Sequence, residues 1–284
     1  MRLGVPPATA ARQVRDGRAD VATGLTPQSD PGTRGGLRTL VQPIPGLRLL
    51  WINPDRRALR NTRLRRALSL ALDRAALAPL SGPVPNAANH GPAGLPTDQL
   101  IPPQFPGHRD VRAAPLRGPD LPEARRLAGH GRHRLVLWTC NIAPCPRRAA
   151  IIAADLRAIG VHVTVHRLPG PVLARRAGNP GNYDLTTSGW VADYADPSEF
   201  TNLLLRQNPR MRAWPPLLRA ARSFGRRRLA AYARLDAELS RTLLPIIPYA
   251  VDAERDLLGP RAACPTSQPL YGLDLPALCP RQQP

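Results

Sequence analysis

Four cysteines are the residues of this sequence with the most distinctive chemistry. They form two local pairs, Cys140 with Cys145 and Cys264 with Cys279. An even number in two short-range pairs predicts two disulfides and therefore an oxidising compartment. The spacing is unlike that of a zinc finger or ribbon, whose ligands come in closely spaced pairs. Buried free thiols are the alternative that the sequence leaves open.

The other residues that could do chemistry do not assemble into a catalytic set. His162 and His166 share the polar face of a predicted strand and could hold a metal ion, but exposed strand positions are the simpler interpretation. His130 and His133 lie in a loop rich in glycine and arginine. No serine stands in a G-x-S-x-G segment, and without lysine no G-x-x-x-x-G-K-[ST] nucleotide loop can form. We therefore predict that the protein is not an enzyme and uses no metal or cofactor.

The formal net charge of +20 makes binding of a polyanion the first alternative function. All 40 basic residues are arginine, and the accompanying alanine, glycine and proline indicate GC-rich codons as much as selection for phosphate binding. The arginines are scattered, and Arg226–Arg228 is their longest run. Aromatic residues make up only 4%, which is few for stacking on bases. We expect no nucleic-acid partner, and a basic nucleic-acid-associated protein remains the alternative.

A chain of 284 residues is long enough for one large domain or two ordinary ones. No stretch approaches the roughly 20 apolar residues of a membrane-spanning helix. The most apolar stretch, 64–80, is interrupted by charged residues, as in an amphipathic helix. Residues 1–7 contain no signal peptide, which conflicts with the compartment that the cysteines predict. This conflict indicates an incomplete chain whose N-terminal portion is missing.

Hydrophobic periodicity predicts alternating strands and helices and hence an α/β or mixed fold. The clearest helix follows Asn61, which can cap it, and carries apolar residues at helical spacing from Leu64 to Ala75. Residues 79–122 lack periodicity and predict a long ordered loop around a site. We expect further helices at 8–16, 122–128, 147–159, 198–205, 215–223 and 226–243. We expect strands at 19–22, 37–41, 47–52, 135–139, 161–165, 183–190 and 246–251.

Four blocks of sequence carry a family resemblance. They are Asp16–Ala22, Leu50–Asn53 followed by Arg63–Arg74, Ala150–Val165, and Gly189–Phe200. The last block, GWVADYADPSEF, is similar to the pattern GWxADYxDPxxF, and the third is similar to IxxxLxxIGxxVxV. In this order, the blocks resemble the family-five extracellular solute-binding proteins, which include oligopeptide- and dipeptide-binding proteins. The resemblance implies the substrate-binding component of an ABC importer, which captures peptides or related amine-bearing solutes.

The resemblance also implies an architecture. The family has a periplasmic-binding-protein-like (type II) α/β fold, in which two lobes enclose the ligand. Its chain order would place residues 1–50 at the end of lobe one, 51–245 in lobe two and 246–284 in a return segment to lobe one. Most of lobe one would then be missing, so a nonfunctional fragment is a further alternative. We expect a monomer outside the cytoplasm, periplasmic or at the cell surface, whose partners are the ligand and the ABC permease subunits.

The resemblance finally implies a ligand site. Asp193 stands where relatives pair an aspartate with the ligand's α-ammonium group, and Trp190 would give an apolar wall beside it. Capping of backbone amides is the alternative for Asp193 and the favoured role of Asp196, and Trp190 could equally lie in the core. Asp73 and Arg74 are interpreted as a charge pair at a helix end. An arginine should bind the carboxylate of a peptide, but the sequence does not single one out.

Overall fold

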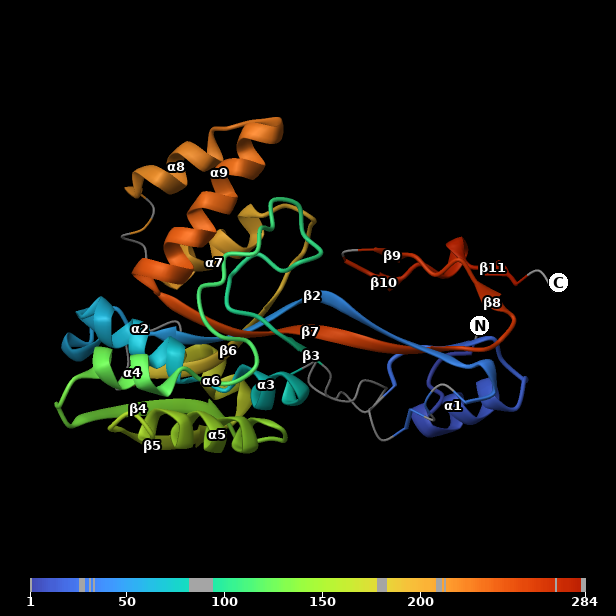
Figure 1. Cartoon of the computed structure of the whole chain (residues 1–284), viewed down its shortest axis with the longest axis horizontal. Coiled ribbons are helices and arrows are strands. Elements are labelled where there is room, and N and C mark those ends of the chain that lie inside the picture. Colours follow the sequence, from blue (N-terminus) through green and yellow to red (C-terminus); the bar gives the residue numbers. More distant parts are fainter. Residues whose placement is uncertain are drawn as a thin grey trace.

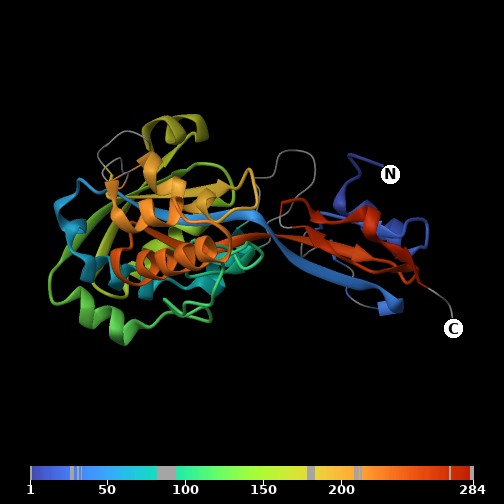
Figure 2. The same cartoon turned by 90° about the horizontal axis from the view of Figure 1, so that it is seen from above.

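The computed structural model shows two parts of unequal size joined by two long strands (Figure 1). These strands, β2 (Arg38–Ile52) and β7 (Ile246–Leu258), run through both parts, and Figure 2 shows them crossing the narrow junction. The larger part holds most of the helices, whereas the smaller part holds both ends of the chain. The structure describes all residues except 1, 26–28, 31, 33, 82–93, 178–182, 208–210, 212, 269 and 282–284, and the side chains of 204–207.

One mixed sheet organises the larger part and continues into the smaller one. Its strand order is β1 (Val21–Ala22), β7, β2, β6 (Leu185–Val191), β4 (His133–Cys140) and β5 (Val161–Leu168). Strand β4 is parallel to both β5 and β6, whereas the pairs made by β2 and β7 are antiparallel. A short strand, β3 (Gly94–Pro96), pairs with β7. This sheet, with helices on both faces, is the α/β fold that the sequence predicts.

Strand β2 corrects the prediction of two strands at 37–41 and 47–52. The backbone stays extended through both prolines, and the register against β7 shifts between Pro43 and Leu47. A proline cannot donate to a ladder, but a bulge leaves such a position unpaired without ending the strand. The two predicted strands are therefore the two halves of one strand that links both parts of the molecule.

Helices cover both faces of the sheet (Figure 1). One face carries α2 (Thr62–Ala71), α3 (Arg74–Leu77), α4 (Leu121–Ala128) and α5 (Cys145–Arg157). The other carries α7 (Ser198–Gln207), α8 (Pro215–Ala221) and α9 (Gly225–Glu238). The smaller part contains α1 (Pro7–Arg15), and α6 (Gly170–Ala177) follows β5. Apart from the helix that follows Asn61, the predicted helices are confirmed with small shifts at their ends. The last one is shorter than predicted: α9 ends at Glu238, and a π-type turn occupies Leu239–Leu243.

Two apolar cores lie on opposite faces of the sheet. Side chains of a strand alternate between faces, so Leu50 joins the core under α2 and α5, whereas Leu49 joins the core under α7 to α9. This double burial explains the continuous apolar run at the end of β2. Strand β5 instead alternates buried or half-buried with exposed positions from Val161 to His166, as predicted for a half-buried strand. None of the described helices is long and apolar enough to cross a membrane.

For α2, the clearest helix in the sequence, the predicted cap is confirmed but the predicted end is wrong. Asn61 caps α2 as expected, because its side chain accepts a hydrogen bond from the Arg63 N–H at 2.9 Å. The predicted continuation to residue 75 is wrong, because Leu72 is extended and ends the helix. Asp73 then caps a new helix, α3, by accepting from the Ala76 N–H at 2.9 Å. An aspartate that bonds backbone amides favours a helix start over a helix interior.

Arg74 is not half of a charge pair at a helix end. Its side chain is completely buried and donates to the carbonyl oxygens of Thr97, Pro248 and Ser69 at 2.7–3.2 Å. Its Nη2 also donates to Ser69 Oγ at 3.0 Å. Burial lowers the pKa of Arg74 to about 10, so the guanidinium stays charged at neutral pH. Arg74 therefore links three segments by hydrogen bonds to their backbone: the end of α2, strand β7 and the loop after β3.

Both predicted disulfides are present, and none of the four cysteines is free. The first, Cys140–Cys145, joins the end of β4 to the start of α5, and the second, Cys264–Cys279, lies in the smaller part. The Cα atoms are 5.5 Å apart in each. Around the second disulfide lie the short strands β8 (Ala262–Ala263), β9 (Ser267–Gln268), β10 (Gly272–Leu273) and β11 (Cys279–Pro280).

Candidate functional site

Strand β6 has one edge that is only partly paired. On one side it pairs with β2 along its whole length, from Leu185 to Val191. On the other side, the pairing with β4 covers only Leu185 and Thr186. Within the described residues, the edge of β6 beyond Thr186 therefore lacks a neighbouring strand.

The hydrogen bonds to β2 fix the direction of the main-chain groups on this edge. The Ala192 N–H donates to the Pro45 carbonyl at 2.9 Å, and at the other end the Asn53 N–H donates to the Asp184 carbonyl at 3.0 Å. Because hydrogen-bonding direction alternates along an antiparallel strand, the N–H and C=O groups of Gly189 and Val191 point away from β2. Such an edge can accept an extended peptide as an additional strand.

A cavity of about 340 Å³ lies beside this edge. Its walls come from the end of β4, the start of α5, helix α6 and strand β6. The lining residues are Arg48, Cys140, Cys145, Arg148, Gly170, Leu173, Ala174, Thr187, Ser188 and Gly189. Its volume is within the range of small-molecule sites. The Cys140–Cys145 disulfide thus lies in the wall of a cavity and holds the two elements that form it.

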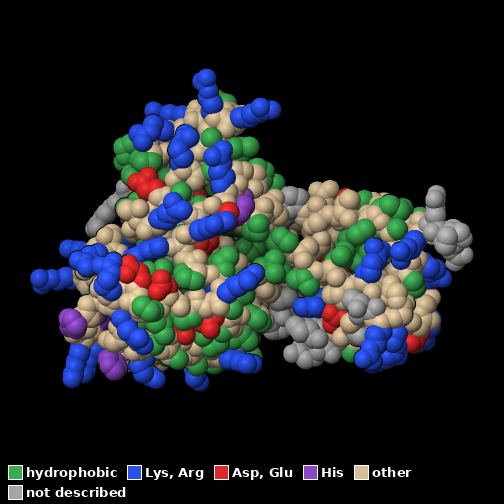
Figure 3. All heavy atoms as spheres, in the orientation of Figure 1, with side chains coloured by type: hydrophobic (Ala, Val, Ile, Leu, Met, Phe, Trp, Pro, Cys, Tyr) green, Lys and Arg blue, Asp and Glu red, His purple; other side chains and the backbone are tan. Residues whose placement is uncertain are grey.

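A second cavity, of about 270 Å³, lies at the junction of the two parts. Strands β2 and β7 form its floor, and Leu270 and Tyr271 reach it from the smaller part. Val191 lines it too and is 58% exposed. The end of β6 therefore lies between two cavities, one in the larger part and one at the junction, where Figure 3 shows hydrophobic side chains gathered.

Asp193 follows the open edge directly, because β6 ends at Val191. Its side chain is exposed. Trp190 is half-buried: it packs against the core under α7 to α9, and its Nε1–H donates to Glu199 Oε1 at 3.0 Å. The structure thus places the two predicted ligand residues at the end of one strand, with Asp193 facing solvent and Trp190 contacting the core.

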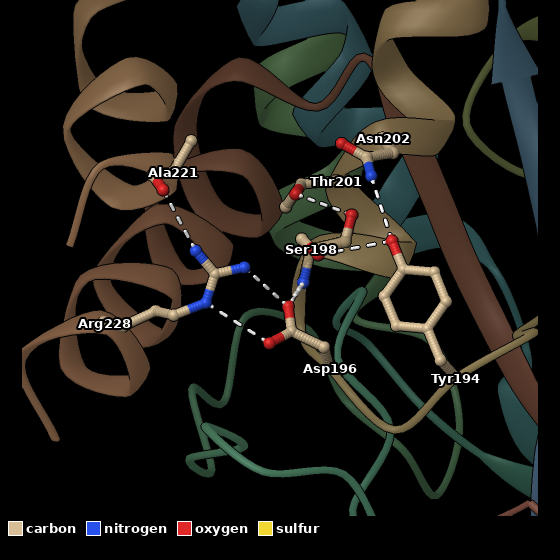
Figure 4. Close-up of polar contacts among 7 residues, drawn as sticks. All are labelled: Tyr194, Asp196, Ser198, Thr201, Asn202, Ala221 and Arg228. Carbon is tan, nitrogen blue, oxygen red and sulfur yellow. Dashed lines mark hydrogen bonds and ion pairs between the residues drawn. The ribbon is translucent and has the colours of Figure 1, made fainter. Parts of the chain in front are cut away.

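The loop that carries Asp193 is fixed by its neighbours (Figure 4). As predicted, Asp196 caps α7, accepting from the Ser198 N–H at 2.8 Å. Its two oxygens also accept from Arg228 of α9 at 2.9 and 3.2 Å. Burial opposes ionisation of Asp196, but the hydrogen bonds from Arg228 and Ser198 outweigh it and hold the pKa of the carboxyl below its usual value. Tyr194 adds a hydrogen bond from Asn202 at 3.3 Å. Asp193 is therefore presented on an ordered turn.

A buried ion pair supports the floor of both cavities. Arg48 of β2 and Asp252 of β7 form a bidentate pair, with Arg48 Nε donating to Asp252 Oδ1 at 2.7 Å. Desolvation opposes the charge on Arg48, but Asp252 outweighs it and raises the pKa of the guanidinium above its usual value. A Cβ atom at Gly46 would overlap the Asp252 carboxylate, and one at Gly189 would overlap the Arg48 guanidinium. These two glycines give the ion pair its space.

We expect Gly189→Ala to lower the free energy of unfolding by about 1 to 3 kcal/mol, because the added methyl group displaces the buried guanidinium of Arg48. Denaturant unfolding of the oxidised protein measures this change. Gly170→Ala is the matched control, since Gly170 lines the same cavity but an added Cβ meets nothing within 4 Å. Its expected change is below about 0.5 kcal/mol. Equal losses in the two variants would contradict the steric argument.

Sequence reasoning missed the charged residues behind this site. Arg48, Asp252 and Arg148 carry no local pattern that separates them from other charged residues, and Arg48 and Asp252 are 204 residues apart. The one signal in the sequence was Gly189, the glycine of the GWxADY pattern. A larger residue there would overlap the Arg48 guanidinium.

His162 and His166 are exposed on β5, and His133 lies 3.1 Å from the Ala128 carbonyl through its Nε2 atom. In the described part of the chain, no three His, Cys, Asp or Glu side chains gather closely enough to hold a metal ion.

Comparison with solved structures shows the fold. The structure of HbpA2 from Haemophilus parasuis superposes with a TM-score of 0.74 at 20% identity, covering 95% of this chain and 55% of that one. A dipeptide binding protein from Pseudoalteromonas sp. SM9913, in complex with Met-Leu, gives 0.62 at 19% identity, with 97% and 56% covered. The periplasmic binding protein DppA from Helicobacter pylori, in complex with peptide STSA, gives 0.66 at 18% identity, with 94% and 54% covered. The chain spans about 55% of the length of the first of these proteins.

Comparison with protein families gives the assignment. No curated protein sequence matches the chain. Residues 3–211 match the family described as bacterial extracellular solute-binding proteins, family 5 Middle. This match covers most of the chain and includes all four blocks that carry the resemblance. Its members are binding proteins rather than enzymes. The chain belongs to the family 5 bacterial extracellular solute-binding proteins.

Proposed function

We propose that the chain is the substrate-binding component of an ABC importer and that it captures peptides or related amine-bearing solutes. The open edge of β6, which ends two residues before the exposed carboxylate of Asp193, carries this proposal. Peptide ligands in two of the similar structures, Met-Leu and STSA, support it.

The geometry suits a ligand with an extended backbone and a free amine. Main-chain groups of Gly189 and Val191 would pair with the ligand backbone whatever its side chains, which favours broad specificity. Asp193 would form a charge-assisted hydrogen bond with the ammonium group, which is strongest where water is excluded. The two cavities beside the edge would accept ligand side chains.

The division into lobes belongs to the same proposal. The smaller part would be the end of lobe one and its return segment, residues 1–50 and 246–284, and the larger part would be lobe two, residues 51–245. Strands β2 and β7 would then act as the hinge, and the ligand would select the closed state. We further propose that the protein works outside the cytoplasm as a monomer and delivers its ligand to ABC permease subunits.

We expect amine-bearing peptides to raise the melting temperature of the oxidised protein, and Asp193→Ala to abolish the increase. A ligand that binds only the native state stabilises it in proportion to the logarithm of its excess over Kd. Asp16→Ala is the matched control, because Asp16 is an exposed aspartate at the end of α1 in the smaller part. N-acetylated peptides should give no shift in any variant.

Other outcomes would reject the proposal. Shifts that survive in Asp193→Ala would remove the ammonium role. The absence of a shift with any peptide would indicate a nonfunctional fragment. Binding of nucleic acid that weakens steeply with salt would favour a nucleic-acid-associated protein. Figure 3 shows arginines scattered over this face of both parts rather than gathered in one patch, which gives that alternative no support.

A further inference from the structure

The two sulfur atoms of the Cys140–Cys145 disulfide lie in different surroundings. Both cysteines line the cavity of about 340 Å³ beside β6. Cys140, at the end of β4, is half-buried, whereas Cys145, at the start of α5, is only 3% exposed. Thiol–disulfide exchange requires access to the sulfur that is attacked. A small molecule therefore reaches the Cys140 sulfur more easily than the Cys145 sulfur.

The less accessible sulfur is in contact with a buried positive charge. Arg148, one turn further along α5, is 6% exposed and donates from Nη2 to Cys145 Sγ at 3.1 Å. Its Nη1 donates to Tyr249 Oη at 3.5 Å, and its Nε is buried without a hydrogen-bond partner among the described residues. The sulfur of a disulfide is a weak acceptor, whereas a thiolate forms a charge-assisted bond with a guanidinium. Arg148 therefore stabilises Cys145 far more as a thiolate than as part of the disulfide.

The position of Cys145 in α5 favours the same anion. Cys145 is the first residue of this helix of 13 residues, where the positive end of the helix dipole lies. A cysteine at a helix start or beside an arginine has a stabilised thiolate, and a stabilised thiolate is the better leaving group in exchange. Accessibility and charge therefore assign complementary roles, with Cys140 as the attacked sulfur and Cys145 as the leaving one.

We propose that Cys140–Cys145 is a reactive disulfide, in which a small thiol attacks Cys140 and Cys145 leaves as a thiolate held by Arg148. The incoming thiol first loses its proton to solvent. Its sulfur then bonds to Cys140 Sγ, the bond between Cys140 and Cys145 breaks, and the electron pair of that bond goes to Cys145 Sγ. The incoming sulfur is oxidised, Cys145 is reduced, and Cys140 carries a mixed disulfide. This inference does not depend on the proposed function.

The second disulfide provides a comparison within the same molecule. Cys264 follows β8 and is exposed, and Cys279 begins β11 and is half-buried. Neither cysteine starts a helix, and no charged side chain in the described part of the chain donates to either sulfur. Accessibility alone would make Cys264–Cys279 the faster of the two to react. The surroundings of Cys145 predict the opposite order.

Limited reaction of the native, fully oxidised chain with mercaptoethanol tests the proposal. Iodoacetamide added at early times alkylates the free thiols, and mass spectrometry of the peptides then locates both groups. We expect Cys140–Cys145 to open about 10-fold or more faster than Cys264–Cys279, with mercaptoethanol on Cys140 and the alkyl group on Cys145. A rate no higher than that of Cys264–Cys279, or an early adduct on Cys145, would overturn the proposal.

Substitution of Arg148 tests the cause. Arg148→Met should slow the opening of Cys140–Cys145 about 10-fold, because the leaving thiolate loses its positive partner. Arg147→Met, in the exposed neighbouring residue of α5, should leave the rate unchanged, and Arg148→Lys should recover part of it. In denaturant, all variants should open at the wild-type rate, since the contact exists only in the folded chain. Arg148→Met opening as fast as the wild type in the native state would sink the assignment.

Discussion

Replacing Arg74 by alanine should lower the free energy of unfolding by about 4 kcal/mol. The change removes a buried donor from the carbonyl oxygens of Thr97, Pro248 and Ser69, and each group that is left unsatisfied costs about 1 to 3 kcal/mol. The large side chain also leaves a cavity where the surface exposure is zero. Relief from burying a charge offsets part of these costs.

Denaturant unfolding of the oxidised protein measures this effect. Arg63→Ala is the matched control on the neighbouring helix α2, because Arg63 is exposed and its loss should change stability by less than about 0.5 kcal/mol. Arg74→Met fills much of the volume but supplies no donor, so it should remain strongly destabilised. A methionine variant as stable as the wild type would show that packing, and not hydrogen bonding, holds this region.

Replacing Asp252 by alanine should lower the free energy of unfolding by about 3 to 4 kcal/mol. Asp252 is 2% exposed and Arg48 is 12% exposed, so the change leaves a buried guanidinium without its carboxylate. Loss of one partner of a buried ion pair costs more than loss of both, because an isolated charge cannot be solvated.

A double-mutant cycle tests the cause. In the Arg48→Met background, Asp252→Ala should cost much less, so the double variant should be more stable than Asp252→Ala alone. Ile246, a buried residue of β7 outside the pair, provides a packing control through Ile246→Val. Strictly additive losses in the cycle would mean that the two residues stabilise the strands independently.

The sequence predicted the elements whose signals are local. Asn61 and the alternation from Val161 to Val165 each act through neighbouring residues, and both have the predicted effect. The prediction failed where a distant strand decided the outcome. Pro43 and Pro45 suggested a break in the strand. Pairing with β7 on both sides of these prolines keeps β2 continuous.

The candidate site was predictable only in part, and for the same reason. Asp193 and Trp190 were identified from a family pattern that is contiguous in sequence. The open edge of β6 depends on where its pairing with β4 ends. No residue within β6 indicates that position. Arg148 lines the cavity beside β6 and is 6% exposed, and both are properties of the folded chain.

The arrangement of β2 and β7 has a consequence for the order of folding. The larger part is an insertion between these two strands, and its helices and β4 to β6 make mostly local connections. The smaller part instead depends on contacts such as that between the Gly24 N–H and Asp256, which lie 232 residues apart. Loop closure over such a separation is entropically costly and slow. The smaller part therefore cannot form before β7 has been synthesised, and we expect it to fold after the larger part.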